Sequence, residues 1–515
     1  MEHKTIRKIE INGDELTFEE FIQVCLKRYT VNLSELAARK IVHSRSIIEE
    51  MLVNSQTIYG VTTGFGYQCK NEVPEADRKK LQNNLIVSHA VGVGEPLETE
   101  VVRGIMFLLV NSLAKGYSGV RLILVETIIQ MLNKGVHPIV PKKGSLGSSG
   151  DLVPMSHLIL PLIGLGIAEY KGVKLNGREA MQKAGIELIR LEEKEGLSCI
   201  NGTYAMTSLG IIILYNALNV LKVADMAAAL TFEALRGIAN IFQERVHMLR
   251  PHQGQLDTAH NMRLLLENSG MVYTDLWVKN QDAYSLRCIP QVHGASKDSY
   301  NFALHTLIIE MNAVNDNPVI FEDTKDIVTS GNFHGQPIAL CLDFLCMALS
   351  EIANISERRI ERLVNPSLSN GLPGFLIRNN RINSGFMIVQ YVAAALVSEN
   401  KILSHPACVD SIPTSANQED HVSMGMISAN KASEVLKNTR NVIAMELLCS
   451  CQGIDLRGDK MLGKGTRAAY AQIRKFVSYL EEDQEMSQAI GVCEQLIVRG
   501  DLIACVEQVV GTLII

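Results

Sequence analysis

Apolar residues recur at helical spacing along most of this chain. Residues 338–364 (IALCLDFLCMALSEIANISERRIERLV) show the pattern clearly, because leucines and isoleucines stand three or four positions apart from Leu342 to Ile355 and a charged face closes the segment. The spacing predicts one long helix there. By the same criterion, further helices are expected over residues 99–133, 204–237, 299–314, 385–404 and 430–450.

Strand patterns are rare by comparison. Alternation is convincing only in short runs such as VKLNG near residue 173, and the 14 prolines are too few to interrupt the helical segments often. Neither a repeat nor a low-complexity linker is evident. The sequence therefore predicts a mainly α fold made of long bundled helices. Helices this long and this apolar usually need a second chain to cover them, so we expect a homo-oligomer.

Size, charge and cysteine content narrow the class of protein. A chain of 515 residues with 47 % hydrophobic residues can bury a large core, and a net charge of −6 without a basic stripe argues against a nucleic-acid partner. The first ten residues, MEHKTIRKIE, carry no apolar signal region, which indicates a cytoplasmic protein. Eleven scattered cysteines without a CxxC pair indicate reduced thiols, each expected as a small buried hydrophobe, and neither disulfides nor a metal site.

The longest uncharged run, residues 197–221, raises the question of a membrane span. It contains Asn201, Asn216 and Asn219 with several serines and threonines, and such side chains are costly in lipid. A buried core helix is therefore expected, and no membrane partner.

Glycine-rich loops stand out against the helical background. Such loops let the backbone approach a ligand and let polar side chains converge, although loops also simply connect helices. The segments concerned are YGVTTGFG (59–66), HAVGVGEPL (89–97), KGSLGSSGD (143–151), EGLSCINGT (195–203), SGNFHGQP (330–337) and TSANQEDH (414–421).

Residues 144–157, GSLGSSGDLVPMSH, join the most flexible of these loops to an apolar segment. A linker would have polar flanks, a phosphate-binding loop would end in Gly-Lys-Ser/Thr, and a nucleophile elbow would match GxSxG; none of these patterns fits. A plain helix-entry turn does fit, with Asp151 near the first helical turn as N-cap and Pro154 just inside the helix.

A chemical alternative fits the same loop. The middle residue of Ser148-Ser149-Gly150 can lose water to give dehydroalanine, and the unhindered Gly150 amide can attack the carbonyl of residue 148. A second dehydration closes a five-membered ring, 4-methylidene-imidazol-5-one (MIO), which is an electrophile made from the chain itself. Ser-Ser-Gly is common, so these three residues alone do not establish the chemistry.

The loop resembles the GSxGASGDLxPLSH signature of the aromatic amino acid ammonia-lyase family, whose members form MIO from Ala-Ser-Gly. The resemblance implies a fumarase/aspartase-like helical core, with a smaller mixed N-terminal domain over 1–205 that carries MIO and an elongated helical bundle over 206–515. It covers nearly the whole chain through the ordered segments YGVTTGFG, NNLIVSHAVGVGEPL, EGLSCINGT, NQDAYSLRC, PQVHG, NAVNDNP, SGNFHGQP, INSGFMIVQYVAAALVSENK and PTSANQEDHVSM.

The resemblance assigns catalytic roles residue by residue. Tyr59 matches the catalytic base, although a phenol is a weak base at neutral pH unless nearby positive charge or helix dipoles lower its pKa. Arg287 matches the residue that binds the substrate carboxylate through its planar fork. Tyr284, three residues earlier and so on the same helix face, matches a residue that supports MIO and proton transfer, and Gln281 belongs to the same motif.

Further residues match the family's binding positions. Asn201 corresponds to a residue that hydrogen-bonds the substrate or the ring carbonyl, and Phe333 corresponds to a pocket-lining aromatic. Asp151 follows the ring-forming triad and is expected to assist its formation. Read alone, each has a simpler explanation: a turn asparagine, a core aromatic and a helix N-cap.

Two positions bear on the substrate. Ser88-His89 lies at the family's selectivity pair and resembles the histidine-specific members, although a tyrosine enzyme can also use His89 to hold a phenol. Glu419 offers a carboxylate to an imidazole N–H, and phenylalanine would leave that charge unpaired. Together they favour elimination of ammonia from L-histidine to give trans-urocanate, the first step of histidine degradation.

The chain departs from the histidine-specific pattern at several points. Ser148 replaces the usual alanine, Gln336 replaces a usual glutamate, and SCING replaces a more aliphatic stretch before Asn201. A tyrosine or other aromatic amino acid ammonia-lyase, or a 2,3-aminomutase that returns ammonia to the β-carbon, uses the same residues and stays open.

Two other classes of protein fit less well. The fumarase and argininosuccinate lyase group continues its Gly-Ser-Ser loop as Met-Pro-x-Lys, whereas this loop has no lysine. A degenerate, non-enzymatic relative would lack Tyr59, Ser149 or Arg287, and all three are present. The resemblance further implies a homotetramer with each active site shared among three subunits, a small-molecule amino acid as the partner, and neither a metal nor an external cofactor.

Overall fold

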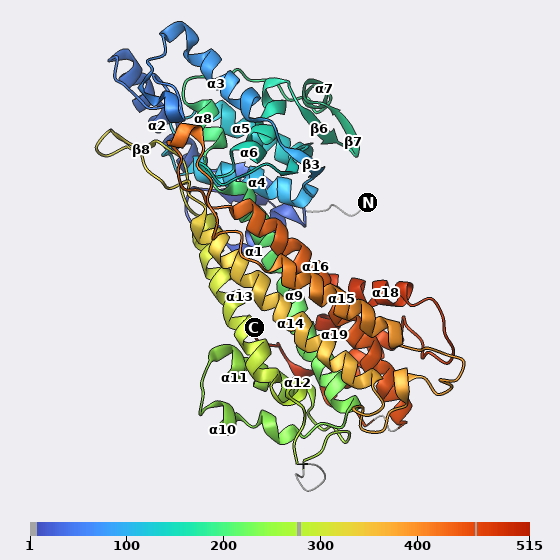
Figure 1. Cartoon of the computed structure of the whole chain (residues 1–515). Coiled ribbons are helices and arrows are strands. Elements are labelled where there is room, and N and C mark those ends of the chain that lie inside the picture. Colours follow the sequence, from blue (N-terminus) through green and yellow to red (C-terminus); the bar gives the residue numbers. More distant parts are fainter. Residues whose placement is uncertain (1–7, 275–279, 459–460) are drawn as a thin grey trace. The chain divides into compact units, whose positions relative to one another are not determined.

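The computed structural model describes residues 8–274, 280–458 and 461–515, and helices make up most of them (Figure 1). The prediction of a mainly α fold is confirmed. The chain divides into two compact units. Unit 1 consists of residues 1–212, 304–342 and 406–430, and unit 2 consists of residues 213–303, 343–405 and 431–515. The expected boundary near residue 205 stays a prediction.

Unit 1 contains the shorter helices of the chain. Their termini follow local sequence signals: Thr17 and Glu20 form a reciprocal capping box, and Gly135 ends a helix in the left-handed conformation with φ 75°. The helices are α1 (Phe18–Cys25), α2 (Glu35–Val53), α3 (Glu75–His89), α4 (Thr99–Ala114), α5 (Leu122–Lys134), α6 (Leu152–Ile159), α7 (Gly177–Lys183) and α8 (Glu195–Ile200).

Small sheets accompany these helices in unit 1. The run VKLNG does form a strand, and Lys171 and Gly172 turn the chain into it with φ of 53° and 79°, the positive values that a tight hairpin needs. Sheet pairs are β1 (Lys8–Ile11) with β2 (Thr30–Leu33), β3 (Val93–Pro96) with β5 (Pro141–Lys143), and β8 (Val319–Phe321) with β9 (Asp326–Val328); the three-stranded sheet has the order β4 (Val136–Pro138), β6 (Ile167–Tyr170), β7 (Val173–Asn176).

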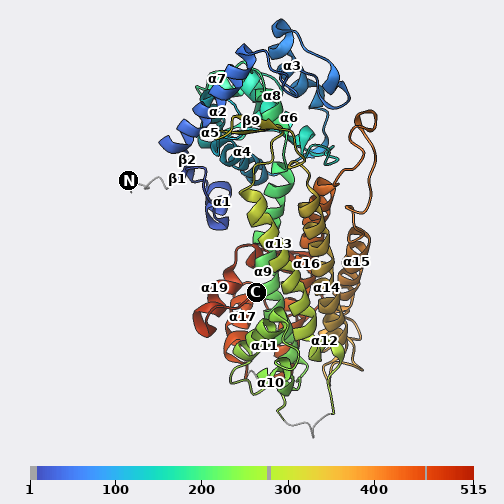
Figure 2. The ribbon, with the colours of Figure 1, turned by 90° about the vertical axis from the view of Figure 1, so that its left-hand side faces the viewer.

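Each of four long helices has some of its residues in unit 1 and the rest in unit 2. They are α9 (Tyr204–Ala234), α13 (Ile289–Met311), α14 (Gln336–Val364) and α16 (Gly425–Arg457). In unit 2 they run alongside one another and alongside α15 (Met387–Leu403), which is the predicted bundle (Figure 2). The remaining helices of unit 2 are α10 (Glu244–His247), α11 (Gln253–Leu265), α12 (Tyr284–Arg287), α17 (Lys464–Arg474), α18 (Ser487–Val498) and α19 (Asp501–Val510).

Charged side chains buried in the unit 2 bundle are paired. The Arg359 guanidinium donates to both oxygens of Glu446, at 2.5 and 2.8 Å, and Lys297 Nζ donates to Asp225 at 2.7 Å. All four side chains are fully buried. Pairing of this kind is what makes charge tolerable inside an apolar bundle.

Two expectations about helix boundaries are wrong. The segment 99–133 forms two helices, α4 and α5, because Gly116 and Gly119 adopt φ of 84° and 66°, which a helix excludes. The segment EGLSCINGT is helical from Glu195 to Ile200, although its two glycines suggested a loop. Burial of every residue of α8 outweighs the weak helix propensity of its glycine.

The long uncharged run, residues 197–221, was predicted as one buried helix but covers the end of α8, a break at residues 201–203 and the first part of α9. α9 and α14 are long and apolar enough to cross a membrane by length and composition, but 72 % and 67 % of their most apolar windows is buried inside the structure. Such burial is expected of the central helices of a globular protein.

Candidate active site

A cavity of about 300 Å³ in unit 1 brings together loops that are far apart in the sequence. Four residues singled out in the sequence line it, namely Tyr59, Ser149, Phe333 and Glu419. Its other lining residues are Gly66, Cys69, Asn317, Thr329 and Gln418. The volume is at the lower end of the range for small-molecule sites.

The loop that carries Tyr59 is fixed by its apolar neighbours. Ile58 and Val61 are buried against Ile47 and Ile48 of α2 and against a β8 residue, Ile320. Tyr59 lies between these two anchors, so its ring is held at the cavity while the flanking side chains fill the core. Tyr59 can be held in this way because the sequence places a residue with a polar tip between two apolar residues.

The electrostatic surroundings of Tyr59 oppose its ionisation. Burial raises the pKa of the phenol, the Gly66 amide that donates to its oxygen at 3.1 Å lowers it, and the Glu419 carboxylate raises it again. The net direction is upward from the ordinary value of 10.0. Within unit 1, therefore, the Gly66 amide is what favours the phenolate.

The Ser148-Ser149-Gly150 loop is bent back on itself. Ser149 has φ 52° and Gly150 has φ 82°, both in the left-handed region. The Gly202 amide donates to Ser149 O at 3.2 Å, and the Asp151 amide donates to Gly202 O at 2.7 Å. A Cβ on residue 150 would lie 2.1 Å from Gly202 O, so only glycine fits there. The sharp bend and the bare residue 150 are the features that ring closure requires.

Asp151 stands at the N-cap position of α6, but its side chain does not cap that helix. Its carboxylate instead accepts hydrogen bonds from Ser145 Oγ at 2.9 Å and from the Met206 amide at 2.8 Å. The residue is fully buried, and burial raises the pKa of its carboxyl to about 6. The simple N-cap explanation of Asp151 is therefore wrong, and the side chain ties the bent loop to the start of α9.

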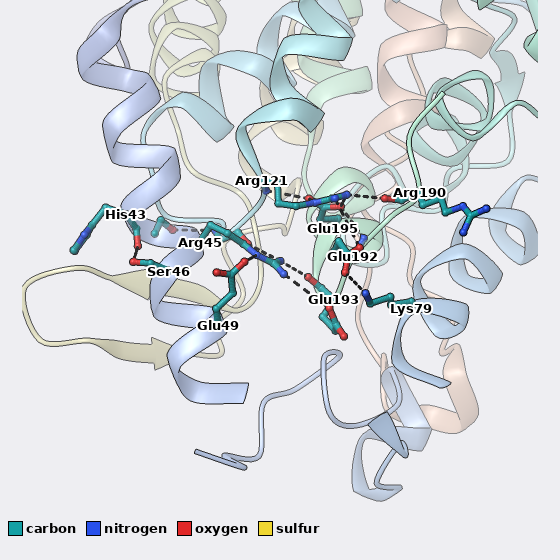
Figure 3. A network of polar contacts seen from close by, with 12 residues as sticks. His43, Arg45, Ser46, Glu49, Lys79, Arg121, Arg190, Glu192, Glu193 and Glu195 are labelled. Atoms are coloured by element: carbon teal, nitrogen blue, oxygen red, sulfur yellow. Dashed lines mark hydrogen bonds and ion pairs between the residues drawn. The ribbon is translucent and has the colours of Figure 1, made fainter. Parts of the chain in front are cut away.

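Asn201 ends α8 and lies next to the cavity. Its Nδ2 donates to Asn317 O at 2.8 Å, and Asn317 is a lining residue. The start of α8 is held by Glu195, which is wholly buried and accepts two hydrogen bonds from the Arg121 guanidinium at 2.9 and 2.7 Å (Figure 3). The Glu192 amide donates to the same carboxylate at 2.7 Å. This polar network fixes the helix that carries Asn201.

Glu419 reaches the cavity from the loop before α16. Its Oε2 accepts hydrogen bonds from Ser148 Oγ and from Thr414 Oγ1, the latter at 3.2 Å. Its Oε1 faces Gly66, where an added Cβ would stand 3.4 Å from that oxygen. The carboxylate thus has one oxygen occupied by the protein and the other at the cavity wall.

Ser88 and His89 lie at the end of α3. Ser88 Oγ and His89 Nδ1 are 3.0 Å apart. Burial lowers the pKa of His89, while the backbone of Leu85 and the charge of Glu419 raise it; the net direction is downward, so the imidazole is neutral at physiological pH. Neither residue is among those that line the cavity, and the charge of Glu419 is the link between His89 and that site.

Five lining residues were not predicted from the sequence. Gly66, Asn317 and Gln418 belong to quoted motifs but were not singled out, and Thr329 directly precedes one. Cys69 was expected to be a buried hydrophobe like the other cysteines, which is wrong, because it is half-buried and faces the cavity. A polar residue in or next to a quoted loop motif is the signal that could have found Asn317, Thr329 and Gln418; Cys69 gives no such signal.

Gln281, Tyr284 and Arg287 belong to unit 2, and none of them is among the residues that line the unit 1 cavity. Tyr284 and Arg287 do share one face of α12 as their spacing predicts, since Arg287 Cζ lies 4.5 Å from the centre of the Tyr284 ring. Tyr284 is 70 % exposed. Among the described residues, Arg287 Nε is buried without a hydrogen-bond partner.

Solved structures resemble the whole chain. A histidine ammonia-lyase from Trypanosoma cruzi is 40 % identical, with a TM-score of 0.90, over 97 % of this chain and 95 % of that one. A tyrosine aminomutase from Streptomyces globisporus is 38 % identical, with a TM-score of 0.94, over 99 % of each chain. The same fold thus accompanies two different reaction outcomes in these proteins.

Sequence relatives cover the chain just as fully. A histidine ammonia-lyase from Alkaliphilus oremlandii is 54 % identical over 505 residues, which are 98 % of this chain and 99 % of that protein. The family model described as Aromatic amino acid lyase matches residues 16–475. With the bent Ser-Ser-Gly loop, Tyr59 and Glu419 around one cavity, these matches establish that the chain belongs to the aromatic amino acid lyase family.

Proposed function

We propose that this lyase eliminates ammonia from L-histidine and releases trans-urocanate. One observation carries the proposal: Glu419 stands in the wall of the same cavity as Tyr59 and Ser149, and its Oε1 lies beside Gly66, another residue that lines the cavity. Of the two carboxylate oxygens, Ser148 and Thr414 donate only to Oε2, so Oε1 can accept a hydrogen bond, and the imidazole N–H of histidine supplies one. The relative from Alkaliphilus oremlandii, a histidine ammonia-lyase, supports the same substrate.

The prosthetic group is proposed to be MIO, formed from Ser148, Ser149 and Gly150 without an external cofactor or a metal. The positive φ values of Ser149 and Gly150 and the absence of room for a Cβ at residue 150 fit such a ring. The chemistry that MIO supplies is electrophilic activation of the substrate amine as a leaving group. Asp151, buried and anchored to Ser145 and Met206, holds the loop in its bend.

Tyr59 is proposed as the base. Elimination breaks one Cβ–H bond and the Cα–N bond of histidine, the proton goes to Tyr59 Oη, and the C–H electron pair becomes the double bond of urocanate as ammonia leaves. The Gly66 amide, at 3.1 Å from Tyr59 Oη, stabilises the phenolate that accepts this proton. Because burial raises the pKa of Tyr59, we expect proton abstraction to become faster as the pH rises.

Other residues are proposed to hold the substrate. Ser88 and His89 act with Glu419 around the imidazole, and the neutral state of His89 lets it accept or donate one hydrogen bond. Phe333 covers the ring, and Asn201 orients the substrate through its amide. Their combined effect is to select an amino acid with a flat, N–H-bearing side chain.

Arg287 is proposed to bind the substrate carboxylate, with Tyr284 and Gln281 beside it. Its Nε, buried without a partner among the described residues, and its stacking on the Tyr284 ring suit a guanidinium held ready for an anion. On the basis of the family resemblance, we propose that a homotetramer completes each site with loops from three subunits. Support comes from exposed apolar side chains of α14 and α15 in unit 2: Phe344, Met347, Ile388, Tyr391, Val392 and Ile402.

Intact-mass measurement and product spectra test the proposal together. The purified protein should weigh two water molecules less than its sequence, and the loss should map to the peptide that contains residues 148–150. Histidine should give the ultraviolet absorbance of urocanate, while tyrosine and phenylalanine should react far more slowly. Glu419→Gln should weaken histidine turnover, and unchanged turnover would refute the assignment of histidine.

The aminomutase alternative has a distinct product. It would yield a β-amino acid of unchanged mass alongside the unsaturated acid, and chromatography of the reaction mixture separates the two. The structure from Streptomyces globisporus favours this alternative, because that protein is a tyrosine aminomutase and resembles the present chain over its whole length. Accumulation of β-histidine would refute the lyase proposal and support the aminomutase alternative.

A further inference from the structure

Ser148 makes a contact that alanine at the same position would not make. Its Oγ donates a hydrogen bond to Glu419 Oε2, across 271 positions of sequence. Thr414 Oγ1 donates to the same oxygen at 3.2 Å. A cyclised triad preserves the Ser148 side chain, because ring closure uses the carbonyl of residue 148 and leaves its Cα and Cβ outside the ring.

The two oxygens of the Glu419 carboxylate therefore have different surroundings. Oε2 accepts from two hydroxyls of the protein, whereas Oε1 faces Gly66 at the cavity wall. A carboxylate held at one oxygen keeps its plane fixed, and a fixed acceptor loses less rotational freedom when a ligand binds. The geometry thus leaves Oε1 as the acceptor for an incoming N–H.

We infer that Ser148 is a positioning residue for substrate selection: its hydroxyl orients Glu419 so that Oε1 accepts the imidazole N–H. The inference rests on the proposed histidine substrate. Ser148 then contributes selectivity in addition to its carbonyl contribution to the ring. Substitution of Ser148 should weaken ligands that carry a ring N–H and leave isosteric hydrocarbon rings almost unaffected, because only the former use Oε1.

Equilibrium binding to an uncyclised protein isolates this effect from turnover. Ser149→Ala cannot form dehydroalanine, so it serves as the parent, with trans-urocanate and trans-cinnamate as calorimetric probes. Adding Ser148→Ala should raise the Kd of urocanate roughly tenfold, the factor expected for one hydrogen bond to a charged group, and should change the Kd of cinnamate less than about twofold. Ser148→Thr keeps a hydroxyl and should restore urocanate binding.

Three further variants make the test specific. Thr414→Val removes the second donor to Oε2 and should weaken urocanate in the same direction. In a Glu419→Ala background, Ser148→Ala should have no further effect on urocanate, since the coupling partner is gone. Ser487→Ala is the matched control, because it removes an exposed Ser–Glu hydrogen bond of 2.9 Å to Glu485 in unit 2 and should change neither Kd.

The outcomes separate the two proposals. If the parent binds urocanate and Ser148→Ala leaves its Kd unchanged, or weakens both probes equally, the inference about Ser148 is wrong and the histidine proposal stands. If the parent binds cinnamate and not urocanate, the histidine proposal fails and the inference fails with it. In the cyclising protein, Ser148→Ala should raise the KM for histidine by a larger factor than it lowers kcat, with the two-water mass loss intact.

Discussion

Gly150→Ala probes whether the bend of the ring-forming loop is set by backbone contact. Residue 150 has φ 82°, and a Cβ there would stand 2.1 Å from Gly202 O and 2.5 Å from Gly202 C. Both neighbouring atoms are backbone, so no side-chain rotation can relieve the overlap. Gly202 is in turn tied to the loop, since it donates to Ser149 O at 3.2 Å and accepts from the Asp151 amide at 2.7 Å.

The expected loss of stability follows from these contacts. An alanine in the left-handed region costs about 1–2 kcal/mol. Moving Gly202 away weakens its two backbone hydrogen bonds, each worth about 0.5–1.5 kcal/mol net. The sum is about 2–5 kcal/mol, and the displaced loop no longer holds the residue 150 amide against the carbonyl of Ser148. Gly150→Ala should therefore lower stability and abolish the two-water mass loss.

Gly172→Ala is the matched control for the backbone conformation. Gly172 has φ 79°, but an added Cβ would meet nothing within 4 Å, so only the conformational cost of about 1–2 kcal/mol applies. Thermal unfolding and intact mass, measured on both variants, separate the two effects. A Gly150→Ala protein that matures fully and unfolds at the same temperature as Gly172→Ala would refute the reasoning.

Two further predictions concern pH. Because the pKa of Tyr59 is raised above 10.0, its phenolate fraction grows across the accessible pH range, and kcat/KM should rise from pH 7 to pH 9.5. A flat pH profile would contradict the assignment of Tyr59 as the base. Replacing the phenol in Tyr59→Phe should lower kcat by about 10²–10⁴-fold. Burial raises the pKa of Asp151 from 3.8 to about 6, so the folded protein binds this proton more tightly than the unfolded chain, and stability is lost as pH rises through this interval. Asn cannot lose this proton, so in a Ser149→Ala background the free energy of unfolding of Asp151→Asn should rise relative to its parent from pH 4 to pH 7, by up to about 3 kcal/mol in chemical unfolding. A difference between the two proteins that does not change with pH would contradict the raised pKa of Asp151.

The sequence predicted the helical class well because apolar periodicity extends over many turns. The segment 99–133 was wrongly predicted as one helix, because the two positive-φ glycines between α4 and α5 interrupt the helix without interrupting the apolar pattern. It also took EGLSCINGT for a loop, whereas complete burial makes α8 helical. Local propensity is weak, and tertiary burial overrides it in short segments.

Several residues that carry distinctive motifs lie around one cavity, and their roles in the reaction stay predictions. Tyr59, Ser149, Phe333 and Glu419 line one cavity, as their motifs suggested, whereas Cys69 gave no signal of its own. The N-cap explanation of Asp151 failed because the bond partners of a carboxylate depend on the fold: Met206, 55 positions away, supplies one of them.

The motifs and the apolar periodicity are enough to indicate the family, the helical class and the chemical identity of the residues around the cavity. Which atoms of those residues meet depends on the folded chain. Ser148 and Glu419 are separated by 271 positions, and nothing local indicates that one hydroxyl holds one oxygen of the other's carboxylate. Periodicity and motifs report what each segment is made of, but a contact between distant segments depends on how the whole core folds and on the burial that holds each backbone in place.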